Sequence, residues 1–102
     1  MPVVDVIWDP EAEADLDSIL EYIAKDNLEA AINVTNEIYQ QVSMMLAPVS
    51  RRGKKGRVAG TMELVILRTS YIAVYVKKGS LLRIIKVLHG SEMLRFGVMK
   101  VR

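Results

Sequence analysis

Two residues in the last third of the chain have side chains that could perform acid–base or phosphate chemistry. His89 is the single histidine, and imidazole is the side chain best suited to exchange a proton near neutral pH. Residues 81–89 are predicted to form a strand, and alternation places Arg83 on the same face as His89. Cleavage of RNA by 2′-hydroxyl attack needs a base, a cation for the charged phosphorane and an acid. His89, as acid or base, and Arg83, as phosphate clamp, are therefore the candidate catalytic residues. The alternative for His89 is a hydrogen-bonded structural residue that ends an apolar strand.

A second candidate site is a basic loop with three glycines, predicted over residues 47–61. Five bases crowd into this loop and are the candidate target- or nucleic-acid-binding residues: Arg51, Arg52, Lys54, Lys55 and Arg57. Met62, which begins the next predicted strand, belongs to the same candidate surface. The loop lacks the GxxxxGK[ST] spacing and precedes a strand, so it is not a P-loop.

Composition excludes several other kinds of site. The chain has 102 residues and no cysteine, which rules out disulfides, thiolate zinc sites and cysteine nucleophiles. One histidine cannot build a multi-histidine metal site, and we expect no metal and no cofactor. The apolar runs are too short to span a membrane and the N-terminus lacks a signal-peptide pattern. We therefore expect a cytoplasmic protein with no membrane partner.

Charge is distributed unevenly along the chain. Residues 1–50 hold ten acids and one base, whereas residues 51–102 hold thirteen bases and two acids. One interpretation is a basic surface that attracts nucleic acid or an acidic protein. The other is an acidic helical layer that complements a basic sheet within the same molecule.

Hydrophobic periodicity predicts the elements that position these residues. A first strand is expected over residues 3–8, and Asp9-Pro10 should start a helix that breaks at Asp26-Asn27. The buried stripe of this helix is Leu16, Ile19, Leu20 and Ile23. The acids of its opening turns, Asp15 among them, are interpreted as a solvated face that stabilises the helix dipole.

A second helix is predicted over residues 28–46 from the stripe Ala31, Val34, Ile38, Val42 and Met45. Strands follow over residues 62–69, 71–77 and 81–89, the last two joined by a tight turn. The expected fold is α+β: an N-terminal strand, then an antiparallel helical hairpin packed on a mainly antiparallel sheet that three C-terminal strands complete. Residues 1–102 should form a single domain.

A series of short motifs follows this order of elements. They are Trp8 before an acidic helix, Tyr22-Ile23, Gly56-Arg57, Gly60-Thr61-Met62-Glu63-Leu64-Val65, Tyr71-Ile72-Ala73-Val74-Tyr75 and Val87-Leu88-His89-Gly90. Together they resemble the RelE/ParE superfamily, toxins of bacterial type II toxin–antitoxin systems often labelled plasmid stabilisation proteins. The resemblance covers residues 3–92. It implies a RelE/ParE-like fold and a toxin neutralised by a cognate antitoxin, ParD- or RelB-like.

The ParE-type branch is the more similar one, through Gly-Thr-x-Glu-Leu-Val and Leu88-His89-Gly90. That resemblance implies growth inhibition by binding DNA gyrase, with no catalytic residues in the toxin itself. The alternative is a RelE-like endoribonuclease that cuts mRNA on the ribosome, for which His89 and Arg83 are the candidate residues. Against it, Glu63 and Val65 stand where such enzymes carry lysines, and Ile72 and Gly90 where they carry arginines.

Met62 departs from the pattern of the resemblance, which usually reads Gly-Thr-Arg-Glu-Leu-Val. Loss of a cation beside the basic loop would weaken target binding. A toxin that has lost its activity is therefore a further alternative.

Overall fold

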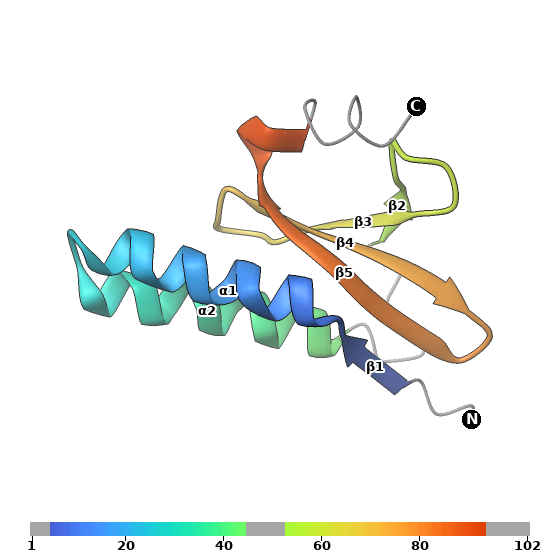
Figure 1. Cartoon of the computed structure of the whole chain (residues 1–102), viewed down its shortest axis with the longest axis horizontal. Coiled ribbons are helices and arrows are strands. Elements are labelled where there is room, and N and C mark those ends of the chain that lie inside the picture. Colours follow the sequence, from blue (N-terminus) through green and yellow to red (C-terminus); the bar gives the residue numbers. More distant parts are fainter. Residues whose placement is uncertain (1–4, 45–52, 94–102) are drawn as a thin grey trace.

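The computed structural model describes residues 5–44 and 53–93, and Figure 1 shows their arrangement. The elements in chain order are β1 (Asp5–Trp8), α1 (Pro10–Ala24), α2 (Leu28–Ser43), β2 (Lys54–Lys55), β3 (Met62–Val65), β4 (Tyr71–Lys78), β5 (Leu81–His89) and the 3₁₀ helix η2 (Gly90–Glu92). The sheet order is β1-β5-β4-β3-β2. β1 runs parallel to β5, and every other pair is antiparallel. The α+β class and the mainly antiparallel sheet are confirmed.

The helical hairpin forms where the sequence predicts it. Pro10 is the first residue of α1, and the Asn27 side chain caps α2 by accepting the Ala30 N–H at 3.0 Å. Asp9 stands at the N-cap position of α1. Its side chain makes no cap hydrogen bond and instead faces Arg83. Neither α1 nor α2, the helices within residues 5–44, has the length and hydropathy needed to cross a membrane.

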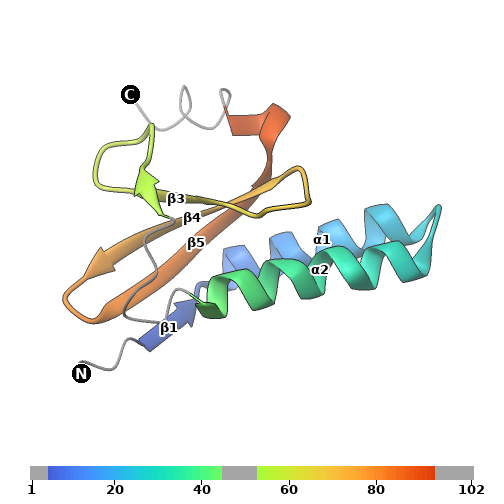
Figure 2. The ribbon, with the colours of Figure 1, turned by 180° about the vertical axis from the view of Figure 1, so that it is seen from behind.

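The two helices cover one face of the sheet, and the main core lies between these layers (Figure 2). Leu16 and Ile19 of α1 and Ile38 and Val42 of α2 contribute to it, as the helical periodicity predicts. The strands contribute Leu64, Ile66, Ala73, Tyr75, Leu82, Ile84 and Val87. Ile38 is fully buried, and cutting such a side chain to alanine typically costs about 2–5 kcal/mol.

A smaller apolar cluster lies on the other face of the sheet. Val74, Leu88 and Met93 form its buried centre, and Ile72 and Ile85 pack against them. The cluster explains why both faces of β4 and β5 are apolar in the sequence.

A β-bulge in β5 changes which residues share a face. Val74 pairs with Lys86 and Tyr75 pairs with Ile84, so Ile85 has no partner on β4. Side chains after this extra residue fall on the face opposite to the one that regular alternation predicts. Ile84 and Val87 accordingly lie in the same core cluster. The predicted common face for Arg83 and His89 is therefore wrong.

Two boundaries in the second half also differ from the prediction. The predicted loop contains β2, a short edge strand in which Lys54 pairs with Glu63 and Lys55 with Met62. The strand predicted over residues 62–69 ends at Val65, and a turn leads to β4. The tight turn between β4 and β5 is confirmed. Its first residue, Gly79, has φ +60°, as in a two-residue type II′ turn.

The turn between β3 and β4 is clamped by α2. The buried Gln41 side chain donates to the Leu67 carbonyl at 2.9 Å and accepts the Leu67 N–H at 2.7 Å. The next residue, Arg68, has φ +67° and donates to both oxygens of Glu37, at 2.9 and 3.1 Å. These contacts from α2 thus hold Arg68 in the left-handed backbone conformation.

Candidate functional site

The His89 side chain is built into the start of η2. Its Nδ1 accepts the Ser91 N–H at 3.1 Å and lies 2.8 Å from Ser91 Oγ. Its own backbone N–H donates to Glu92 Oε1 at 2.9 Å, which completes a capping box. Because Nδ1 accepts this backbone hydrogen bond, the neutral ring carries its proton on Nε2. One of the two ring nitrogens, Nδ1, therefore takes part in a structural hydrogen bond.

A cavity of about 440 Å³ lies beside His89, between α1 and the end of β5. Tyr22, Tyr71 and Glu92 line it, and the Tyr71 ring stands edge-on to the imidazole at 5.4 Å. Burial raises the pKa of Tyr71, and the negative charge of Glu92 adds to the shift. Among the described residues, no lysine or arginine lines the cavity. The cavity therefore offers no described cation that could stabilise a phosphorane.

Arg83 is held away from this cavity. Its Nε lies 3.0 Å from Asp9 Oδ1 and 3.2 Å from Oδ2. His89 falls on the face of Leu82, Ile84 and Val87, opposite to Arg83, and about 20 Å along the strand from it at 3.3 Å per residue. The structure does not bring the two candidate catalytic residues together. Their catalytic assignment stays a prediction.

Asp15 of α1 fixes the bulge of β5. One carboxylate oxygen accepts the Val87 N–H at 2.9 Å, and the other lies 3.1 Å from Lys86 Nζ. Glu11 Oε1 lies 3.6 Å from the same ammonium. Burial lowers the pKa of Lys86, but hydrogen bonding and charge from Asp15 and Glu11 outweigh it, and the net shift is upward. The interpretation of Asp15 as part of a solvated face is wrong, because its carboxylate contacts the Val87 N–H and the Lys86 ammonium. Helical periodicity does not show which backbone N–H groups of a distant strand need an acceptor.

These contacts define a charged seam between the helical layer and the sheet. It consists of the pairs Asp9–Arg83, Asp15–Lys86 and Glu37–Arg68. Part of the charge asymmetry is therefore neutralised inside the molecule, as one of the two interpretations proposes. Sequence reasoning missed each of these pairs, whose partners lie far apart along the chain.

The predicted basic loop divides into residues with different surroundings. Arg57 donates to Glu63 Oε2 from its backbone N–H at 2.9 Å and from its Nε at 3.3 Å. The Glu63 side chain is only 4% exposed, so this pair anchors the loop to β3. Lys54 and Lys55 are exposed on β2. Arg51 and Arg52 lie outside the described residues.

A second hollow, of about 450 Å³, lies where the loop meets the sheet. Lys55 and Lys77 line it, together with Met62, Gly60 and Thr61. Met62 is partly buried and also packs against the main core. Lys77 was not among the predicted site residues, because a lysine near the end of a predicted strand carries no motif.

No group of three or more histidine, aspartate or glutamate side chains in residues 5–44 and 53–93 is placed to hold a metal ion. The candidate sites in this part of the chain are the His89 cavity and the lysine-lined hollow.

Comparisons with known proteins agree with this geometry. A family model described as the ParE toxin of the type II toxin–antitoxin system parDE matches residues 6–94. A solved chromosomal ParDE system from P. aeruginosa is 25% identical with a TM-score of 0.75, over 85% of this chain and 96% of that one. A search of curated proteins found no match.

Two further solved structures share the fold at lower identity. The YoeB/ParE toxin from Agrobacterium tumefaciens is 17% identical with a TM-score of 0.52, over 84% of this chain and 98% of that one. A RelBE2 toxin–antitoxin complex from Mycobacterium tuberculosis is 22% identical with a TM-score of 0.53, over 87% and 99%.

Proposed function

The chain belongs to the ParE toxin family of type II toxin–antitoxin systems, and we propose that it inhibits growth by binding DNA gyrase without catalysing a reaction itself. The ParE-type motifs of the sequence support the choice of target. A toxin of this kind needs an exposed surface rather than a set of reacting groups. It acts in the cytoplasm, where gyrase works.

The separation of Arg83 from His89 is the observation that carries the proposal. A ribonuclease needs a cation next to its acid and base, because charge develops on the phosphorane. Arg83 is paired with Asp9 on the opposite face of β5. On β3, the positions at which similar ribonucleases carry lysines hold the buried, acidic Glu63 and the exposed, uncharged Val65. This arrangement supports binding rather than RNA cleavage.

A cognate antitoxin neutralises the toxin. The solved relatives include a ParDE system and a RelBE2 toxin–antitoxin complex, which supports a ParD- or RelB-like partner. We expect its toxin-binding segment to be acidic and to fold on contact, because basic residues dominate the second half of this chain.

A supercoiling assay with purified gyrase and the full chain tests the proposed function. The informative variant is His89→Asn, since asparagine removes the imidazole yet still offers a cap acceptor to the Ser91 N–H. We expect the wild type and His89→Asn to inhibit supercoiling equally.

The competing result is that the toxin leaves gyrase unaffected but cuts mRNA on translating ribosomes. In that case His89→Asn would abolish the cleavage. A chain that does neither would be an inactive toxin, the alternative raised by Met62. Either result would overturn the gyrase proposal.

A further inference from the structure

Two groups of described basic side chains differ in their surroundings. Each of Arg57, Arg68, Arg83 and Lys86 has a carboxylate within 3.6 Å. No such pair is found, within residues 5–44 and 53–93, for the lysines at the free end of the sheet. We call this group the lysine end: Lys54 and Lys55 of β2, and Lys77 and Lys78 of β4.

From this arrangement we infer that the hollow between Lys55 and Lys77 binds an acidic polypeptide segment, which lies extended along the edge of β2. The inference concerns the chemistry of a partner, and it does not depend on whether gyrase is the target.

The register of the sheet places the two lysines of the hollow on one face. Lys55 pairs with Met62, Met62 pairs with Tyr75, and Lys77 lies two positions beyond Tyr75 along β4. Both lysines line the hollow with Met62 between them. A glutamate side chain suits this space, because its methylenes can contact the Met62 thioether while its carboxylate meets an ammonium on either side.

The backbone beside the hollow favours an extended partner. β2 is the terminal strand of the sheet, next to β3 and to no other described strand. An edge strand presents unpaired N–H and C=O groups, and an extended peptide can add to it as a further strand. Alternate side chains of such a peptide would then point to the face of Lys55 and to that of Lys54.

The lining of the hollow argues against nucleic acid. Sites for single-stranded nucleic acid combine positive charge with aromatic rings on which bases stack. The described residues that line the hollow include no aromatic side chain. They are glycine, alanine, threonine, methionine and lysine, which fit aliphatic and carboxylate groups.

The plain alternative is that the lysines only protect the edge of the sheet from pairing with other chains, a common use of lysine on edge strands. That alternative predicts no affinity for acidic peptides. The inference predicts a measurable affinity that falls with salt, since exposed charges are screened.

The test uses the full chain and a short synthetic peptide in which glutamate alternates with threonine. Titration calorimetry gives its affinity, and NMR of the chain reports which backbone amides shift. We expect binding with shifts confined to β2, the adjacent loop and the Lys77 end of β4, and a loss of about tenfold or more in Lys55→Glu/Lys77→Glu.

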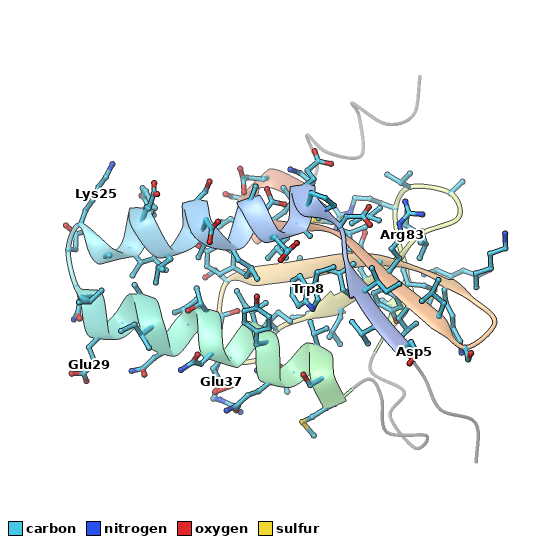
Figure 3. The ribbon with its side chains drawn as sticks, turned by 60° about the horizontal axis from the view of Figure 1, so that its bottom comes forward. Asp5, Trp8, Lys25, Glu29, Glu37 and Arg83 are labelled. Atoms are coloured by element: carbon cyan, nitrogen blue, oxygen red, sulfur yellow. The ribbon has the colours of Figure 1, made fainter. Side chains whose placement is uncertain are left out.

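Lys25→Glu is the matched control, because Lys25 is exposed and lies at the far end of the helical hairpin from Asp5 and Arg83 (Figure 3). It should bind like the wild type. If the reversed variant is not folded by circular dichroism, Lys55→Gln/Lys77→Gln replaces it, with the same direction expected.

Three results would overturn the inference. The peptide could fail to bind, as edge protection predicts. It could bind the wild type and the double variant equally. A single-stranded oligonucleotide of equal charge could bind as tightly as the peptide and be lost with the same lysines, which would make the surface one for nucleic acid. None of these results depends on the gyrase assay.

Discussion

The charged seam and the lysine end use the same residue types for different purposes. In the seam, Arg83 and Lys86 face Asp9 and Asp15, so their charges hold helix and sheet together. At the lysine end, Lys55 and Lys77 face a hollow with no described carboxylate in its lining. A basic sequence is thus not equivalent to a basic surface. Only the cations left over after internal pairing are available to a partner.

The largest effect is expected at Asp15, which contacts both the backbone and a side chain of β5. Asp15→Ala leaves the Val87 N–H without its acceptor and Lys86 without its nearest carboxylate. We expect the free energy of unfolding to fall by about 2–3 kcal/mol, the cost of an unsatisfied buried donor plus a weakened ion pair. Urea unfolding measures this.

Asp17→Ala, at an exposed position of the same helix, is the control and should lose little. If both variants lost the same free energy of unfolding, Asp15 would contribute no more to stability than a solvent-exposed acidic residue of the helix.

The second prediction separates the ion pair of Arg68 from its backbone conformation. Arg68→Ala removes the contact with Glu37 and keeps a side chain at φ +67°. Arg68→Gly removes the same contact and relieves the strain, so the glycine variant should be more stable than the alanine variant by about 1 kcal/mol. Thermal unfolding of both variants tests this. Equal stability would mean that the turn relaxes once its clamp is gone.

A cation introduced at position 62 tests the role of charge at the lysine end. Met62→Arg adds a cation to the hollow of Lys55 and Lys77, and its aliphatic stem can keep the contact with the core. We expect affinity for the acidic peptide to rise about threefold, in line with one further exposed charge contact. We also expect growth inhibition to increase on induction. Equal growth inhibition by both forms would contradict a role for position 62 in activity.

The fourth prediction uses pH and has the smallest expected effect. Hydrogen bonds from Gln41 and Arg68 hold the pKa of Glu37 below its ordinary value of 4.5. The carboxylate therefore stabilises the fold above that pH, and the contribution is lost as the pH falls through the lower folded-state pKa. The difference in Tm between the wild type and Glu37→Gln should shrink from about pH 6 to about pH 3. If the difference in Tm did not change with pH, the ionisation of Glu37 would not be the source of its effect on stability.

The order and type of the main elements could be predicted because their signals are local. The stripe of Ile38 and Val42 reports a helical period, and Asp26-Asn27 reports a break between helices. The bulge at Ile85 could not be predicted, since both faces of β5 are apolar and a shifted alternation leaves the pattern unchanged. β2 was missed because Lys54 and Lys55 have low strand propensity and are ordered by their pairing with β3.

The candidate sites were predicted less well than the fold, for a related reason. His89 and the basic loop were recognised by residue type, but ion pairing depends on partners distant in sequence. Asp9 is 74 positions from Arg83, and no local pattern connects them. In the sequence Arg57 is equivalent to Lys55, and only the contact of Arg57 with the buried Glu63 distinguishes them. The surroundings of a charge, more than its type, decide whether it can meet a partner.

We propose that this toxin acts by binding, through a surface and not through His89. Pulse-labelling tests this mode of action: protein synthesis and DNA synthesis are followed in parallel in bacteria, within minutes of inducing the wild type or His89→Asn without antitoxin. We expect DNA synthesis to fall first, with a DNA-damage response, and to the same extent in both. An early fall in protein synthesis that His89→Asn abolishes would contradict it.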